Sequence, residues 1–472
     1  MTPQKIFFFA IGPVGGALFG IISLPIIAWI FSQEDVGKMA LLNVVLSFAT
    51  LFFTLGLDQA YVREFHEADN KSLLLKTTVI PGLILLVATL AVSLLFGPLL
   101  SKIIFGLDSI GVSWLLAIAL FCSFLSRFLS LVLRMNERGL AFSMSQLLPK
   151  AFLLVIILFF LLFDFAKTFE SLLLANTLAI MLAFSIFAWN TRSEWYQSFF
   201  EKVNILQLQK MLSFGFPLIL GGLAFWGMTS LDRILLSRWS SYSELAIYSV
   251  SVSFAAAATI FQSVFSTVWA PMVYKWASKD EGYDKITMVG RYTVLFVVII
   301  FCLAGMLSWI ISFFLPAQYS SVQWILVACL AYPLFYTLSE TTVVGIGIAR
   351  KSAYSMLACI LALLVNITCN FFLIPSFGAA GAASSTAVSF WAFLVFRTEF
   401  SIYVWKSLPR FRMYIYTLLA VIGSIIGSLK QASAAPYIYC FWFGLLLFCI
   451  FDYRHEVKMS INKIAKTISN YS

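Results

Sequence analysis

Long apolar stretches recur along the whole chain and constrain its fold more than any other feature. Fourteen of them can be read in the sequence, each near the length of about 20 residues that a helix needs to cross a bilayer. Because hydrocarbon offers no water to exposed backbone groups, such segments must be helical. The sequence therefore predicts an all-α polytopic membrane protein. The stretches are 6–31, 36–57, 77–96, 110–133, 140–163, 170–190, 214–236, 246–270, 287–312, 322–347, 354–374, 379–402, 413–429 and 437–452.

Composition and missing motifs argue against an enzyme. Of the 472 residues 61% are apolar and 11% are charged, which leaves no room for a water-soluble catalytic domain. No GxxxxGK[ST], GxSxG or HExxH motif is present, and the glycine pattern GIGIARKS (Gly345 to Ser352) follows no predicted strand. We expect no enzymatic activity and no cofactor, with energy supplied by a proton or sodium gradient.

Cysteine and histidine are placed unfavourably for a metal site. All seven cysteines lie in apolar stretches without a CxxC pair, and the two histidines, His66 and His455, are far apart in the sequence. Free buried thiols are the expected state of these cysteines.

Lys and Arg are distributed unevenly between the loops. If the N-terminus lies inside, the inner loops carry most of them, and the outer loops hold Lys38, Lys102, Lys167, Arg238 and Lys430. Positive loops stay on the cytoplasmic side, so we expect both termini to be cytoplasmic. Topology then explains the formal net charge of +10, and no nucleic-acid partner is expected.

Short strings repeat at a nearly constant offset. ERGLAFSM (Glu137 to Met144) matches ARKSAYSM (Ala349 to Met356), 212 residues later. Such an offset predicts two six-helix lobes inserted in the same sense, with a site between them. The predicted parts are an N-lobe at 1–192, a linker at 193–213, a C-lobe at 214–404, and two further spans with a cytoplasmic tail at 405–472.

The predicted linker carries apolar residues at roughly helical spacing. Trp195, Phe199, Val203 and Leu206 would share one face of a helix. This pattern predicts an amphipathic helix on the inner membrane surface. A solvated linker is the alternative.

Lys150 is the charge that this topology places deepest in the membrane. It lies about 10 residues, or about 15 Å, from the inner end of its span, close to the midplane. A charge there costs about 2.5–3.5 kcal/mol, so such residues usually face a bundle interior or a watery cavity. Pro149 should open the helix beside it. We expect Lys150 in the substrate pathway; a structural lysine paired with a carboxylate is the alternative.

Other charged residues inside spans are also candidates. Arg127 lies near the inner end of the fourth stretch, where snorkelling is the favoured interpretation. Asp232 and Arg233, near the outer end of the seventh, serve either the pathway or an interhelical clamp between the lobes. Glu340 is a candidate proton carrier, since partial burial raises the pKa of a carboxyl group; its alternative is a counter-ion for Lys150 or Arg127.

Three asparagines complete the set of pathway candidates. They could line the same cavity, although hydrogen bonding between helices is their commoner use. They are Asn176, Asn366 and Asn370.

Several strings resemble bacterial polysaccharide and O-antigen flippases along essentially the whole chain. The segment from Phe31 to Phe65, with GLDQAYVR at its end, is similar to their second span. The segments from Phe216 to Trp239, from Glu244 to Lys275 and from Asn366 to Phe390 are similar to their seventh, eighth, and eleventh and twelfth spans. The chain is identified as a Wzx-type member of the multidrug/oligosaccharidyl-lipid/polysaccharide (MOP) exporter superfamily.

The resemblance implies a fold, a substrate and a location. It implies a V-shaped arrangement of two lobes that carries undecaprenyl-diphosphate-linked sugars from the inner to the outer leaflet of the bacterial cytoplasmic membrane by alternating access. Cationic cavity residues would meet the anionic carrier or the sugar, a part that falls here to Lys150, with Arg127 and Arg233 behind it. Membrane lipids, a glycan polymerase and a chain-length regulator are the candidate partners.

Two other functions stay open. A drug or cation antiporter of the same superfamily shares the two-lobe design, but would be expected to place carboxylates at mid-depth. A membrane glycan polymerase or acyltransferase would need large outer loops or a His-acid pair, which the sequence lacks.

Overall fold

The described residues of this computed structural model, 3–203, 205–277, 283–456 and 458, form helices and turns without a strand. The predicted all-α fold is thereby confirmed. The chain divides into two compact units: unit 1 comprises Met1–Ser237 with Ser241–Ala246, and unit 2 comprises Arg238–Ser240 with Ile247–Ser472. The part of the predicted cytoplasmic tail beyond Lys458 lies outside the described residues.

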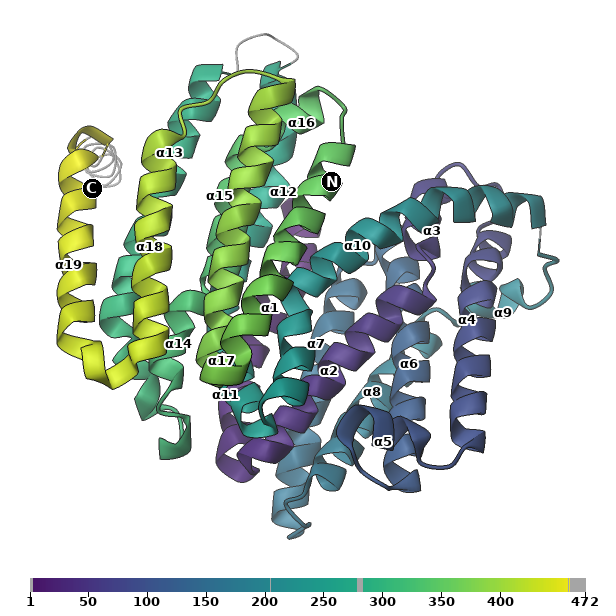
Figure 1. Cartoon of the computed structure of the whole chain (residues 1–472). Coiled ribbons are helices and arrows are strands. Elements are labelled where there is room, and N and C mark those ends of the chain that lie inside the picture. The colour runs from purple at the N-terminus through teal and green to yellow at the C-terminus, as the bar shows by residue number, and fades with distance from the viewer. Residues whose placement is uncertain (1–2, 204, 278–282, 457, 459–472) are drawn as a thin grey trace, which may run out of the picture. The chain divides into compact units, whose positions relative to one another are not determined.

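Figure 1 labels the helices of both units. Unit 1 contains α1 (Pro3–Ile30), α2 (Gln33–Phe53), α3 (Leu57–Glu64), α4 (Lys71–Leu95), α5 (Leu99–Phe105), α6 (Ile110–Met135), α7 (Gly139–Leu162), α8 (Phe169–Asn190), α9 (Arg192–Ser198) and most of α10 (Ile205–Trp239). Unit 2 contains most of α11 (Tyr242–Ala255), then α12 (Ala257–Ala277), α13 (Tyr283–Leu307), α14 (Val322–Cys329), α15 (Ala331–Thr342), α16 (Val344–Ile348), α17 (Ala353–Val404), α18 (Phe411–Lys430) and α19 (Ala435–Asp452). Short 3-10 segments occur at Ser308–Phe313, Ala317–Tyr319 and Gln431–Ala434.

The helices coincide with the fourteen predicted stretches. In the described part of the chain, ten helices are long and apolar enough to cross a membrane, or up to eleven if the bent pair of α11 and α12 counts as one span. Two of the ten, Ala353–Val404 and Phe411–Asp452, each contain two predicted stretches. The shorter apolar helix Val14–Ile30 belongs to the first stretch. The chain is therefore a multi-pass membrane protein.

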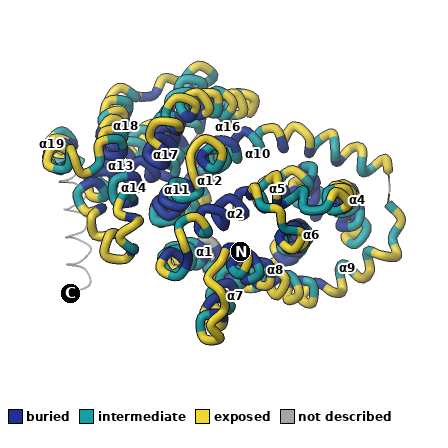
Figure 2. The backbone as a smooth tube through the Cα atoms, turned by 60° about the horizontal axis from the view of Figure 1, so that its bottom comes forward, coloured by how far each residue is buried: buried dark blue, intermediate teal, exposed yellow. Residues whose placement is uncertain are grey.

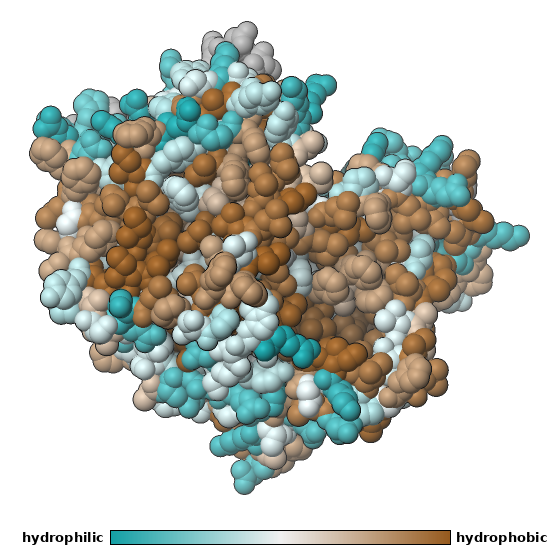
Figure 3. Space-filling view, in the orientation of Figure 1, coloured by the Kyte–Doolittle hydropathy of each residue, from teal (hydrophilic) through white to brown (hydrophobic). Residues whose placement is uncertain are grey.

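Large apolar side chains point outward from the spanning helices. Ile84 and Leu95 on α4, and Val155 and Leu162 on α7, are all exposed. Figure 2 shows exposed residues along the outer sides of helices in each unit, and the faces visible in Figure 3 are largely hydrophobic. Such surfaces suit contact with lipid chains rather than water.

One glycine separates the two spans that α17 contains. Gly378 has a φ of 52° and a ψ of −126°, a conformation that glycine adopts without a side-chain clash. The helix bends there, between the predicted stretches 354–374 and 379–402. Because the chain is helical on both sides of Gly378, the two spans form a single element, α17.

The segment 193–213 is not a single amphipathic helix, contrary to the sequence prediction. α9 ends at Ser198, and α10 begins at Ile205. The Lys76 ammonium donates hydrogen bonds to the carbonyl oxygens of Phe199 and Glu201, at 2.9 and 2.8 Å. Carbonyl groups held by a side chain in this way favour a turn over a continuing helix.

The linker and α10 both pack within unit 1. Trp195 of α9 donates its indole N–H to the Ala188 carbonyl at 2.8 Å, and Trp226 of α10 donates to Ser47 Oγ of α2 at 3.0 Å. The boundary between the compact units therefore lies near the end of α10, after the 193–213 boundary that the repeat predicts. The predicted lobes remain a hypothesis about the repeat.

Candidate functional site

Lys150 occupies the middle of α7, twelve residues into a helix of 24. The helix continues through Pro149, so the predicted break does not occur. Proline lacks one N–H and so removes a single hydrogen bond, the one to the carbonyl of Ser145. Membrane helices tolerate this loss when neighbouring groups satisfy the backbone. Lys150 is therefore presented by a regular helix.

A glycine-lined face of α1 receives α7. A Cβ atom added at Gly12 would lie 2.9 Å from Ser143 Cα, and one added at Gly15 would lie 2.7 Å from Leu147 Cδ2. Both distances are shorter than real side chains allow. The GPVGG string thus lets two backbones approach closely, which is how small residues act between membrane helices.

The Lys150 ammonium lies on this glycine face. Its Nζ donates a hydrogen bond to the Gly16 carbonyl oxygen at 2.5 Å, and a Cβ atom added at Gly20 would lie 3.6 Å from the same Nζ. The glycines of α1 carry no side chains, and the space that this leaves accommodates the half-buried side chain of Lys150. The ammonium is held by a neutral backbone group of a neighbouring span.

No carboxylate neutralises Lys150 among the described residues. The alternative given for Lys150, a structural lysine paired with a carboxylate, is therefore not seen in this part of the structure. A lysine ammonium has three N–H donors, and only the bond to Gly16 is made within the described chain. Two of its donors therefore have no acceptor within the described part of the chain.

Arg127 pairs with a carboxylate that the sequence reasoning did not assign to it. Its Nη2 lies 2.6 Å from Asp58 Oδ2, with the Arg127 side chain 40% exposed and that of Asp58 8% exposed. Asp58 lies at the start of α3, directly after the second span. Arg127 therefore reaches a specific acidic partner, rather than only snorkelling towards water.

Glu340 pairs with Arg397, a residue that the sequence reasoning missed. Arg397 Nη1 lies 2.9 Å from Glu340 Oε1 and also donates to Ser339 Oγ at 2.7 Å. Both charged side chains are nearly buried, at 11% and 14% exposure. Glu340 is thus a counter-ion, as one interpretation proposed, but for Arg397 instead of Lys150 or Arg127.

Aromatic rings complete the surroundings of Arg397. Its guanidinium lies 5.0 Å from the centre of the Phe393 ring and 5.4 Å from that of Tyr336. Trp269 of α12 donates its indole N–H to the Glu340 carbonyl at 2.9 Å. The pair therefore joins α12, α15 and α17 inside unit 2.

The three candidate asparagines are divided between the units, with Asn366 and Asn370 in unit 2 and Asn176, like Lys150, in unit 1. Asn370 Nδ2 donates to Asn366 Oδ1 at 3.0 Å, and Asn366 Nδ2 donates to Ser389 Oγ at 3.4 Å. These fully buried amides join the two arms of α17 across its bend. Asn176 is buried on α8 of unit 1, and its amide nitrogen has no hydrogen-bond acceptor among the described residues.

Asp232 and Arg233 both lie on α10, in unit 1. Asp232 is completely buried, whereas Arg233 is partly buried and donates from Nη1 to the Thr229 carbonyl at 3.3 Å. Neighbouring residues on a helix point about 100° apart, so the two side chains leave α10 in different directions.

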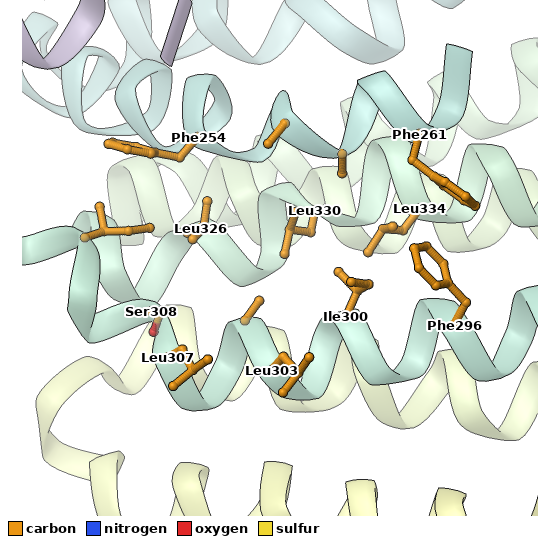
Figure 4. Close-up of a pocket in the computed structure, with 14 residues that line it drawn as sticks. Phe254, Phe261, Phe296, Ile300, Leu303, Leu307, Ser308, Leu326, Leu330 and Leu334 are labelled. Atoms are coloured by element: carbon orange, nitrogen blue, oxygen red, sulfur yellow. The ribbon is translucent and has the colours of Figure 1, made fainter. Parts of the chain in front are cut away.

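Unit 2 also contains an apolar cavity of about 480 Å³ beside the break between α11 and α12. Figure 4 shows aromatic and aliphatic side chains, including Phe254, Phe261 and Phe296, directed towards it, with Ser308 at its edge. This lining suits hydrocarbon and not sugar or phosphate. No group of three or more His, Cys, Asp or Glu in the described part of the chain could hold a metal ion.

Comparison with solved structures identifies proteins that share this architecture. Among solved structures, the lipid II flippase MurJ in an inward closed conformation matches with a TM-score of 0.68 and 15% identity, over 96% of this chain and 100% of that chain. The Vibrio cholerae MATE transporter VcmN, as its D35N mutant, matches with a TM-score of 0.51 and 15% identity, over 84% and 98%. At such identities the likeness establishes a shared fold. No curated protein matches the sequence.

A family model supplies the relationship at the level of sequence. The model described as "Polysaccharide biosynthesis protein" matches residues 3–276, more than half of the chain. The resemblance read from the spans is thereby confirmed at the level of this family. The chain belongs to the polysaccharide biosynthesis protein family.

Proposed function

We propose that this protein is a Wzx-type flippase. It moves undecaprenyl-diphosphate-linked oligosaccharide, the repeat unit of O-antigen or another surface polysaccharide, from the cytoplasmic to the outer leaflet of the bacterial inner membrane. An ion gradient drives alternating access, and both termini face the cytoplasm. The family membership and the fold shared with a lipid II flippase support this assignment.

The observation that carries the proposal is the uncompensated ammonium of Lys150. A lone charge at the centre of a membrane helix is costly, and a neutral carbonyl at 2.5 Å offsets only part of that cost. A diphosphate brings the opposite charge and several strong acceptor oxygens, which form charge-assisted hydrogen bonds with ammonium groups. Lys150 therefore contacts the diphosphate of the carrier in the proposed mechanism.

The other charged candidates receive supporting roles. Arg127 forms an ion pair with Asp58, and Arg397 forms one with Glu340. In the proposed mechanism these pairs hold helices together. We assign Glu340 the role of a counter-ion in place of a proton carrier. Sugar hydroxyls need hydrogen-bond partners throughout the crossing, since each uncompensated polar group costs several kcal/mol in hydrocarbon.

Complementation of a strain that lacks this gene tests the proposal. Lys150→Ala should lower surface glycan at least about tenfold, the effect of losing one charge-assisted hydrogen bond, and undecaprenyl-diphosphate-linked repeat units should accumulate inside. Lys102→Ala, which removes an exposed lysine of the same unit, is the matched control and should export normally. Immunoblots of membranes establish equal protein levels.

Two outcomes would overturn the assignment. Full export by Lys150→Glu at normal protein levels would remove Lys150 from the mechanism. A deletion strain with normal surface glycan but increased sensitivity to cationic drugs would identify an antiporter instead.

A further inference from the structure

Besides its apolar cavity, unit 2 contains a polar cavity beside the turn that joins α16 to α17. Its volume is about 440 Å³. Arg350, Ser352 and Ser355 line it from the turn and the first residues of α17, and Arg397 and Glu340 line it from the spans. Trp269 and Tyr274 of α12 also contribute to its wall. The cavity includes the end of the GIGIARKS string, which the proposed transport role leaves unexplained.

The charges that line this cavity do not balance. Arg397 is neutralised by Glu340 at 2.9 Å. Arg350 is exposed and forms no ion pair or side-chain hydrogen bond with any described residue. Two cations and one anion leave one positive charge facing the cavity.

Hydrogen-bond donors in the cavity also lack acceptors. Arg397 is 9% exposed, and its Nη1 already donates to Glu340 and Ser339. In the same part of the structure, the hydroxyl groups of Ser352 and Ser355 form no side-chain hydrogen bond. Arg350, Ser352 and Ser355 are therefore the lining donors through which this cavity can hold a ligand.

The start of α17 adds a third source of positive potential. Ser352, at the N-cap position, makes no capping hydrogen bond with its side chain, and the first turn contains no acidic residue. The first N–H groups of a helix lack intrahelical acceptors, and the helix dipole favours an anion there. Arg350 is held next to this N-terminus with a φ of 56°, a conformation that is costly for a residue other than glycine.

We propose that this cavity binds a phosphate group, held by Arg350, the two serine hydroxyls and the N-terminus of α17. Phosphate oxygens accept several hydrogen bonds at once, and guanidinium groups match their geometry. By the predicted topology the cavity faces the cytoplasm, where the phosphate belongs either to a lipid headgroup of the inner leaflet or to a soluble phosphate ester. The site lies in unit 2, whereas Lys150 belongs to unit 1, and the proposal does not depend on the proposed flippase function.

Thermal unfolding of the purified full-length protein in phosphate-free maltoside micelles tests the site. At constant ionic strength, one arm adds inorganic pyrophosphate and the other adds phosphatidylglycerol. Stabilisation by pyrophosphate alone assigns a soluble phosphate ester, and stabilisation by phosphatidylglycerol alone assigns a lipid headgroup. Absence of stabilisation in both arms overturns the proposal.

Neighbouring cations provide a matched pair of variants. Arg350→Gln should raise the half-saturating concentration of the active additive about tenfold, the loss expected for one charge-assisted hydrogen bond. Lys351→Gln removes the adjacent exposed charge, which does not line the cavity, and should bind like the native protein. Equal weakening by both variants would mean general charge attraction and would contradict the site, as would unchanged binding by Arg350→Gln.

Discussion

Lys150 in unit 1 and Arg397 in unit 2 are both cations placed within membrane helices, but their surroundings differ. Arg397 has a carboxylate at 2.9 Å, a serine hydroxyl and two aromatic rings. Among the described residues, Lys150 contacts one backbone carbonyl and a face of glycines. The charge of Arg397 is thus neutralised by a carboxylate, and that of Lys150 has no carboxylate partner in the described chain.

This difference separates a structural cation from a functional one. A buried ion pair replaces lost hydration on both sides, so its removal should be neutral only if both partners go together. An unpaired charge in the membrane lowers the stability of the protein. Such a charge is useful only if a ligand of opposite charge binds to it. Removing each charge should therefore change stability in opposite directions.

The largest effect is expected for Glu340→Gln. The change leaves the Arg397 charge buried without a counter-ion, which should cost about 3–5 kcal/mol of stability. Thermal unfolding in micelles would show a large drop in the apparent melting temperature, and Glu340→Gln combined with Arg397→Met should recover much of it. A melting temperature equal to that of the native protein would argue that the pair contributes nothing.

Lys150→Met should act in the other direction. Replacing the ammonium by an apolar side chain of similar length removes an insertion cost of about 2–3 kcal/mol. The apparent melting temperature should rise while export falls. If the variant were instead less stable than the native protein, Lys150 would be a structural residue like Arg397.

A smaller effect is expected for Gly12→Ala on the face of α1 that supports Lys150. The added Cβ would meet Ser143 Cα at 2.9 Å, and the resulting overpacking should destabilise the protein by about 1 kcal/mol or more. Gly221→Ala is the control, because nothing lies within 4 Å of a Cβ atom at that helical position. Equal melting temperatures for the two variants would show that the close approach of α1 and α7 is dispensable.

The spans and the central position of Lys150 could be predicted from the sequence. Hydrophobic length alone locates helices in a bilayer, because no other secondary structure is available to a lone segment there. The depth of Lys150 followed from counting residues along one such helix. Its acceptor did not, because the Gly16 carbonyl carries no side-chain signature.

The partners of the other charges could not be predicted in this way. Arg397 lies inside the stretch 379–402, so counting charges within spans would have found it. Its pairing with Glu340, 57 residues away, depends on how α15 packs against α17. Asp58 and Arg127 are 69 residues apart and present the same problem. A single sequence shows where the helices lie along the chain, but it does not show which helix faces pack against each other.

The role of the Gly16 carbonyl also changes what counts as a binding residue. Part of the electrostatic environment of the lysine is supplied by the main chain, so it is identical for every amino acid that could be genetically encoded at position 16. Alanine scanning would not test this contribution, because an alanine at position 16 keeps the same carbonyl group. The contribution of the oxygen itself would become visible through an amide-to-ester replacement at Ala17, which makes the preceding carbonyl a poorer acceptor without altering any side chain.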